Sequence, residues 1–251
     1  MKRFCRSIAA AFSMFSAIPV PYFPWTEDIM RYMLCAFPLV GVLIGLLCYG
    51  WNTVCLAVSL PDLLRVFGLW LLPILVTGGI HLDGCCDTWD ALAACGDQEK
   101  TAKILKDPHI GSFAVIRLIC MLLGSFVFWM ELKTYRPIPI LLMFVLSRSL
   151  SALAVVSFPL SKESSLAASF AASSDKRNVR IICLAITGAA VTGLILGGAW
   201  CMAAAAALIL LWYRFVLTPR FGGLSGDLAG WFLQTAELWM LAALCVTQSL
   251  F

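Results

Sequence analysis

The chain has 251 residues, of which 61% are hydrophobic and only 13% are charged, and its formal net charge is +4. A soluble domain carries about 45–50% apolar and about 25% charged residues, so this composition excludes a single core surrounded by water. The modest charge and the lack of a basic stripe interleaved with aromatic residues argue against nucleic-acid binding. Its long continuous apolar runs favour membrane helices over a β-barrel, whose strands alternate over roughly 10 residues.

The first 25 residues combine an early positive charge with an apolar stretch. Lys2 and Arg3 precede the apolar residues 8–18, a pattern that also occurs in signal peptides. We favour a short amphipathic helix on the membrane surface, because the remaining topology requires a cytoplasmic N-terminus. The sequence thus predicts an interfacial segment at 1–25 within a single integral membrane domain, 1–251.

A helix that crosses a bilayer needs about 20 mostly apolar residues. Seven segments of the chain meet this requirement, and we expect a polytopic all-α bundle of about seven transmembrane helices. The expected spans are 32–56, 63–80, 111–130, 138–158, 181–198, 199–217 and 229–250.

The basic residues are unevenly distributed between the two sets of connections. One set carries most of them, whereas the other holds little beyond Arg65, Lys133 and Arg136. Lysine and arginine accumulate on the cytoplasmic side of a membrane protein. We therefore expect a cytoplasmic N-terminus and a C-terminus on the opposite side. The more basic set comprises Lys2, Arg3, Arg6, Lys100, Lys103, Lys106, Lys162, Lys176, Arg177, Arg180, Arg214 and Arg220.

Three carboxylates follow the second expected span. Asp83, Asp87 and Asp90 are spaced i, i+4 and i+7, which on a helix places them within an arc of about 60°. Such carboxylates repel one another unless a cation lies between them, and Mg²⁺ prefers hard oxygen ligands. A solvated acidic helix face is the alternative, but no lysine or arginine occurs between residues 65 and 100. The pattern predicts a Mg²⁺ site within a cytoplasmic active-site segment, 81–110.

His81 and several glycines accompany these acids. His81 could act as a base or hydrogen-bond a substrate phosphate, and it could equally cap a span at the interface. Gly78 and Gly79 would allow a bend or a close approach of helices. Gly84 removes a side chain where a ligand comes near, although simple helix packing is the alternative.

Residues 106–113 form a second polar segment ahead of a span. Lys106, Asp107 and His109 lie here, and a cation in this position suits a diphosphate held opposite the acids. Ordinary positively charged flanking of a span is the alternative.

A third segment, 222–227, precedes the last span on the same predicted side. Gly222 and Gly223 begin it and Asp227 ends it. Successive backbone N–H groups in such a loop can form an anion-binding nest, so we consider these residues as substrate-binding. A lone glycine-rich loop is weak evidence.

Three ionisable side chains fall within or near apolar spans. Groups of this kind usually face the interior of a bundle or a water-filled cavity. Arg148 could pair with a carboxylate or a substrate phosphate, whereas Arg117 and Glu237 suit ion pairing between helices.

Taken together, these segments resemble the cobalamin synthase family, the adenosylcobinamide-GDP ribazoletransferases. The resemblance includes residues 15–21 and 37–41 and therefore covers nearly the whole chain in order. Ala91 and Ser225 stand where the family usually has glycine and threonine, and no carboxylate is lost. The three motifs are Gly-Gly-Ile-His-Leu-Asp-Gly-Cys-Cys-Asp-Thr-Trp-Asp, Lys-Asp-Pro-His-Ile-Gly-Ser-Phe and Gly-Gly-Leu-Ser-Gly-Asp.

The resemblance implies a transfer reaction in the cytoplasmic (inner) membrane of a bacterium, with the site facing the cytoplasm. The 5′-hydroxyl of the acceptor, α-ribazole or its 5′-phosphate, would attack adenosylcobinamide-GDP. GMP would leave, and adenosylcobalamin or its 5′-phosphate would form. Mg²⁺ is the implied cofactor and would offset the negative charge on the departing GMP. Lys106 would stabilise the same negative charge. Asp90, Asp107 or His81 would accept the proton. A homo-oligomer, or an association with other enzymes of cobalamin biosynthesis, is left open.

Two other functions are alternatives to a ribazoletransferase. A CDP-alcohol phosphotransferase also opens its acid cluster with Asp-Gly, but it has Ala-Arg where this chain has Asp87-Thr88. A transporter using intramembrane carboxylates would show two related halves, and the sequence has no such repetition.

Overall fold

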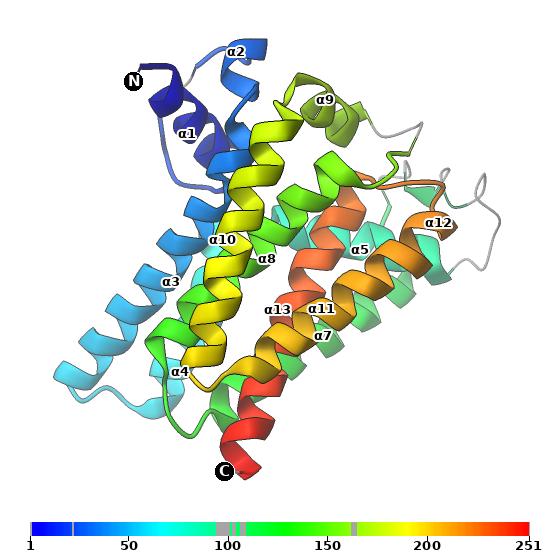
Figure 1. The fold of residues 1–251 in the computed structure, drawn as a ribbon. Coiled ribbons are helices and arrows are strands. Elements are labelled where there is room, and N and C mark those ends of the chain that lie inside the picture. Colours follow the sequence, from blue (N-terminus) through cyan, green and yellow to red (C-terminus); the bar gives the residue numbers. More distant parts are fainter. Residues whose placement is uncertain are drawn as a thin grey trace.

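The computed structural model describes residues 2–21, 23–93, 101, 104–105, 109–161 and 165–250, without the side chains of residues 2–4 and 165–166. These residues form helices and no strand (Figure 1). The single β-type contact among them is an isolated parallel bridge between Leu160 and Leu224. The expected all-α class is confirmed.

Six helical stretches are long and apolar enough to cross a membrane, and they confirm six of the expected spans. The stretch Trp200–Arg220 is continuous but contains a π-helical turn, η1. The six stretches are α3 (Met33–Ala57), α7 (Ser112–Glu131), α8 (Pro137–Ser157), α10 (Lys176–Leu196), the series α11 (Trp200–Trp212), η1 (Tyr213–Leu217) and α12 (Thr218–Arg220), and α13 (Gly226–Leu250).

The remaining expected span, 63–80, has a different form. Helix α4 (Asp62–Thr77) has only 16 residues, and α5 (Ile80–Ala93) follows it at an angle of 86°. Gly78 and Gly79 make this bend with φ values of 62° and 79°, a left-handed conformation that glycine adopts without steric cost. The pair gives a seventh crossing if it counts as one broken span. We treat α4 as the spanning part and α5 as lying outside the membrane-spanning segments.

The spanning helices divide into central and outer ones. In α8, 78% of the apolar window is buried inside the protein, compared with 17% in α7 and 22% in α10. Helix α8 packs against α3, α10 and α13, and α13 also packs against α5, α7 and α11. The outer helices therefore present apolar faces to lipid, as expected for a multi-pass membrane protein.

Three short helices gather at the end of the bundle where the N-terminus lies (Figure 1). They are α1 (Lys2–Phe15), α2 (Glu27–Met30) and α9 (Ser165–Ser173). Helix α1 packs against α3 and buries Ala10, Ala11 and Phe15. The Ser7 hydroxyl donates to the carbonyl of Ile29 over 2.8 Å and thereby ties α1 to α2. As expected, α1 ends before the proline-rich stretch.

Candidate active site

Helix α5 carries the three carboxylates that the sequence places on one helical face. It is continuous from Ile80 to Ala93, so the spacing of Asp83, Asp87 and Asp90 translates into a common face as expected. Asp83 is exposed, whereas Asp87 and Asp90 are half-buried.

Two glycines allow α5 and α13 to touch backbone to backbone. A Cβ atom on Gly84 would lie 2.8 Å from the Cα of Asp227, and one on Gly230 would lie 2.9 Å from the carbonyl oxygen of His81. Both distances are too short for any side chain. At Gly84 it is therefore a second helix, rather than a ligand, that needs the space.

This crossing adds Asp227 to the acids of α5. The Ser225 hydroxyl accepts the N–H of Leu228 over 3.1 Å and so caps α13, which puts Asp227 in its first turn. Burial, followed by the charges of Asp227, Asp83 and Asp90, raises the pKa of Asp87 to about 6. We define the acid site as Asp83, Asp87 and Asp227.

The acid site fits a hydrated cation better than an enclosed one. Among the described residues, no group of three His, Cys, Asp or Glu side chains is arranged to hold a metal ion by itself. No basic side chain in that part of the chain forms an ion pair with these carboxylates either. Mg²⁺ usually keeps several waters and binds through one or two carboxylates and substrate phosphates. Carboxylates gathered on two facing helices therefore suit this ion.

Asp90 is engaged elsewhere. Its carboxylate accepts the backbone N–H of Gly111, the residue that precedes α7. A carboxylate at this position satisfies a free donor at the start of a helix and interacts favourably with the helix dipole. One oxygen of Asp90 thus links α5 to α7, which sets this residue apart from the other two acids of α5.

The glycine-rich loop joins two parts of the chain. The N–H of Gly223 donates to the carbonyl of Thr218 over 2.8 Å, and the N–H of Gly222 donates to Pro219 over 3.1 Å. Gly223 has φ of 138°, and a Cβ atom there would collide with the backbone of Leu160. These N–H groups are therefore occupied within the protein and do not form the free anion nest that we expected.

A cavity of about 400 Å³ opens beside the acid site. His81, Asp83 and Asp227 line it, together with Ser225 and Gly226 at the start of α13. Asp87 and Asp90 do not contribute to its lining. The acid site therefore borders this cavity through Asp83 and Asp227, whereas Asp87 lies outside its lining.

Our sequence analysis missed the aromatic part of this cavity. Phe15 of α1, Phe37 of α3 and Phe170 of α9 line it. Phe15 and Phe37 belong to segments 15–21 and 37–41, which carry part of the family resemblance. That resemblance was the available signal, because nothing local in these apolar segments distinguishes a cavity wall from ordinary packing.

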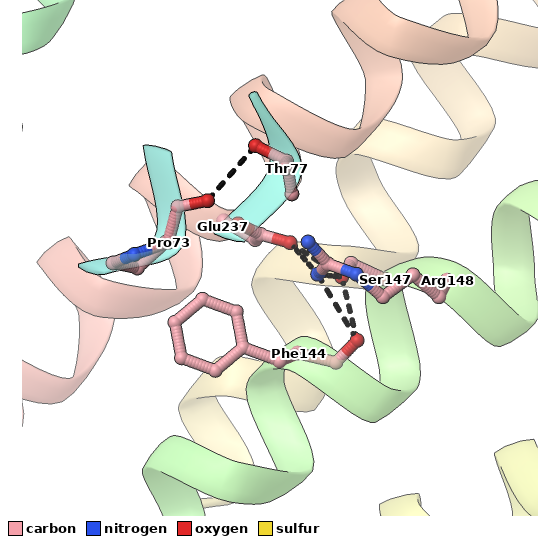
Figure 2. A network of polar contacts seen from close by, with 6 residues as sticks. All are labelled: Pro73, Thr77, Phe144, Ser147, Arg148 and Glu237. Atoms are coloured by element: carbon pink, nitrogen blue, oxygen red, sulfur yellow. Dashed lines mark hydrogen bonds and ion pairs between the residues drawn. The ribbon is translucent and has the colours of Figure 1, made fainter. Parts of the chain in front are cut away.

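Arg148 lies in the bundle interior, where it pairs with Glu237 of α13 (Figure 2). Ser147 adds a 2.7 Å hydrogen bond to the same Glu237 oxygen, and Arg148 also donates to the carbonyl of Phe144 over 3.2 Å. In the same view, the Thr77 hydroxyl of α4 donates to the carbonyl of Pro73 over 2.8 Å. Of the two partners we considered for Arg148, the structure shows the carboxylate, and the guanidinium does not line the cavity.

The structure places none of the remaining expected residues that it describes in the lining of the cavity. Lys106 and Asp107 lie outside the described residues. His109 is exposed and does not line the cavity. Arg117 donates to the carbonyl of Trp89 over 3.5 Å and so contacts the last turns of α5.

Known proteins resemble this chain over nearly its whole length. The family described as cobalamin-5-phosphate synthase matches residues 7–245. An adenosylcobinamide-GDP ribazoletransferase of Lachnoclostridium phytofermentans is 39% identical over 94% of this chain and 92% of its own length. A protein of the same name from Ectopseudomonas mendocina is 34% identical over 96% of this chain and 98% of its own length. Another from Clostridium botulinum is 30% identical over 98% of this chain and 99% of its own length. No solved structure matches the chain.

Proposed function

This chain belongs to the cobalamin-5-phosphate synthase family, and we propose that the acid site between α5 and α13 is where it transfers ribazole. The family and the names of its relatives give the activity, that of an adenosylcobinamide-GDP ribazoletransferase. Such an enzyme joins adenosylcobinamide-GDP to α-ribazole, or to its 5′-phosphate, and releases GMP. The phosphotransferase and transporter alternatives have no support from these relatives.

The family description also leads us to revise one expectation about the nucleophile. A cobalamin-5-phosphate product keeps the phosphate of a 5′-phosphorylated acceptor. The 5′-oxygen of that acceptor is already esterified, so a secondary hydroxyl of the ribose must attack. Its oxygen forms a bond to the phosphorus next to cobinamide, the bond from that phosphorus to the bridging oxygen breaks, and GMP leaves with this oxygen.

We assign the roles of the chain's residues from their positions. Asp83 and Asp87 would hold Mg²⁺, which when bound offsets negative charge on the diphosphate. Asp227 is half-buried, lines the cavity and lies near the other two acids, so it is placed to accept the hydroxyl proton. The clustering of these carboxylates beside a cavity is the observation that carries the proposal.

We place the acid site on the cytoplasmic face of a bacterial inner membrane. The support is the basic character of the connections on that side, among them those around α5 and before α13. A homo-oligomer or an association with other enzymes of cobalamin biosynthesis stays a prediction.

The test is an assay of GMP release by purified membranes. They would be supplied with adenosylcobinamide-GDP, α-ribazole and Mg²⁺, and we expect turnover that a chelator abolishes and Mg²⁺ restores. Asp83→Asn should lower this turnover at least about a hundredfold, because the ligand set loses a charge.

Asp62→Asn is the matched control. Asp62 is exposed and its only described ion pair is with Arg65, three residues along α4, so its loss should leave GMP release unchanged. Turnover that ignores both the chelator and Asp83→Asn would refute the Mg²⁺ site while leaving the family assignment intact.

A further inference from the structure

We propose that the cavity beside the acid site binds the base of the ribazole acceptor, with the aromatic rings of its apolar end against the base and His81 beside a ring nitrogen of the base. This inference rests on the proposed function and adds to it the location of one substrate. The cavity has an apolar end and an acidic end, and the two ends match the two halves of a nucleoside.

Aromatic rings from three helices build the apolar end. The ring centroid of Phe15 lies 4.2 Å from that of Phe37 and 6.2 Å from that of Phe170. All three residues line the cavity. Aromatic side chains bind flat heterocycles by stacking, which contributes about 1–3 kcal/mol per base in other proteins. This end therefore suits a planar aromatic group.

His81 adds one polar atom to this apolar surround. Its ring stacks on that of Phe15 with a centroid distance of 6.4 Å and lies 5.9 Å from that of Phe37. The Nε2 atom is buried and has no hydrogen-bond partner in the described part of the chain. A buried polar atom left without a partner costs about 1–3 kcal/mol. A ring nitrogen of a bound base would supply the missing partner.

The acidic end lies where the ribose would be. Asp83, Asp227 and Ser225 line it, and Gly226 leaves open space where a side chain would otherwise project. A base lying against the phenylalanine rings at the apolar end would leave its ribose beside these residues. This orientation brings a ribose hydroxyl next to the carboxylates that we assign to Mg²⁺ binding and to proton transfer.

The other substrate fits this cavity poorly. Guanine carries several donors and acceptors, and the apolar end would leave most of them without partners, which is costly. A corrinoid with its amide side chains is much larger than a nucleoside, and about 400 Å³ is near the lower end of ligand pockets, which span about 300–1,000 Å³. Adenosylcobinamide-GDP should therefore approach the acid site from outside this cavity.

The first test narrows the cavity. Ala167 of α9 is buried and lines the cavity, so Ala167→Leu would fill part of the apolar end. We expect the KM for α-ribazole to rise at least about tenfold, while the KM for adenosylcobinamide-GDP and kcat stay unchanged. Ala172→Leu is the matched control, because Ala172 is exposed on the same helix.

The second test uses the base itself. Wild-type enzyme should prefer a benzimidazole riboside over the indole riboside, which lacks the ring-nitrogen acceptor, by at least about tenfold in kcat/KM. His81→Phe keeps the aromatic shape and should abolish this preference, because the hydrogen-bonding Nε2 is gone.

The outcomes separate the two proposals. No release of GMP by the wild type with α-ribazole would defeat the proposed function. Turnover in which Ala167→Leu raises the KM for adenosylcobinamide-GDP instead, or in which His81→Phe keeps the preference for benzimidazole, would overturn the assignment of the cavity.

Discussion

Helix α13 carries two acidic side chains whose surroundings differ completely. Glu237 lies in the bundle interior, where Arg148 neutralises its charge and Ser147 donates a further hydrogen bond. Asp227 lies in the first turn and faces Asp83 and Asp87 without a basic partner in the described part of the chain. Within the described residues, Glu237 has a compensating partner, whereas Asp227 lies among further carboxylates.

This difference separates stability from function on a single helix. A buried ion pair that is complete holds α8 and α13 together and leaves no charge for a ligand. A cluster of like charges is unfavourable until a cation binds. The Glu237 region should therefore respond to substitution through stability, and the Asp227 region through activity.

The largest effect should come from breaking the interior pair. Glu237→Leu leaves Arg148 charged and buried without its partner, and we expect it to lower the free energy of unfolding by about 3–5 kcal/mol. The double variant Arg148→Met/Glu237→Leu removes both charges and should recover much of this loss. Thermal unfolding in detergent measures both. A single variant as stable as the wild type would contradict the structural role of the pair.

Asp227→Asn should show the opposite pattern. We expect GMP release to fall at least about a hundredfold, which corresponds to about 2.7 kcal/mol. The unfolding temperature should be unchanged or raised, because the substitution removes repulsion between carboxylates. If GMP release falls only in proportion to the amount of folded protein, Asp227 acts through stability as Glu237 does, and the proposed difference between them is wrong.

Gly84→Ala tests the helix contact that creates the acid site. The added methyl group would lie 2.8 Å from the Cα of Asp227, so α5 and α13 must separate. We expect a loss of about 1–3 kcal/mol in stability together with reduced GMP release. Gly124→Ala in α7 is the control, since a Cβ there meets nothing within 4 Å. Equal effects of the two variants would show that the crossing tolerates separation.

The smallest effect should come from Asp90→Asn. The substitution removes a charge from the start of α7 but keeps an oxygen that can accept the N–H of Gly111. We expect a loss of stability of about 1 kcal/mol or less and a smaller fall in GMP release than Asp83→Asn causes. Equal losses of activity in the two variants would return Asp90 to the set of metal ligands.

The sequence alone determined the features that depend on near neighbours. The apolar runs predicted six spans correctly, because a crossing requires about 20 apolar residues in succession. The spacing of Asp83, Asp87 and Asp90 predicted a shared face, because that face follows from helical periodicity. Hydropathy could not show where the second span ends, because Gly78 and Gly79 turn the chain through their dihedral angles.

Only the tertiary structure decided which distant side chains meet. Asp227 joins the acid site because Gly84 and Gly230 let two helices touch, and Glu237 meets Arg148 because α8 and α13 pack in the same interior. The cavity combines rings from α1, α3 and α9 with acids from α5 and α13. Such contacts arise from how all the helices fill the bundle together, so no short stretch of sequence specifies them.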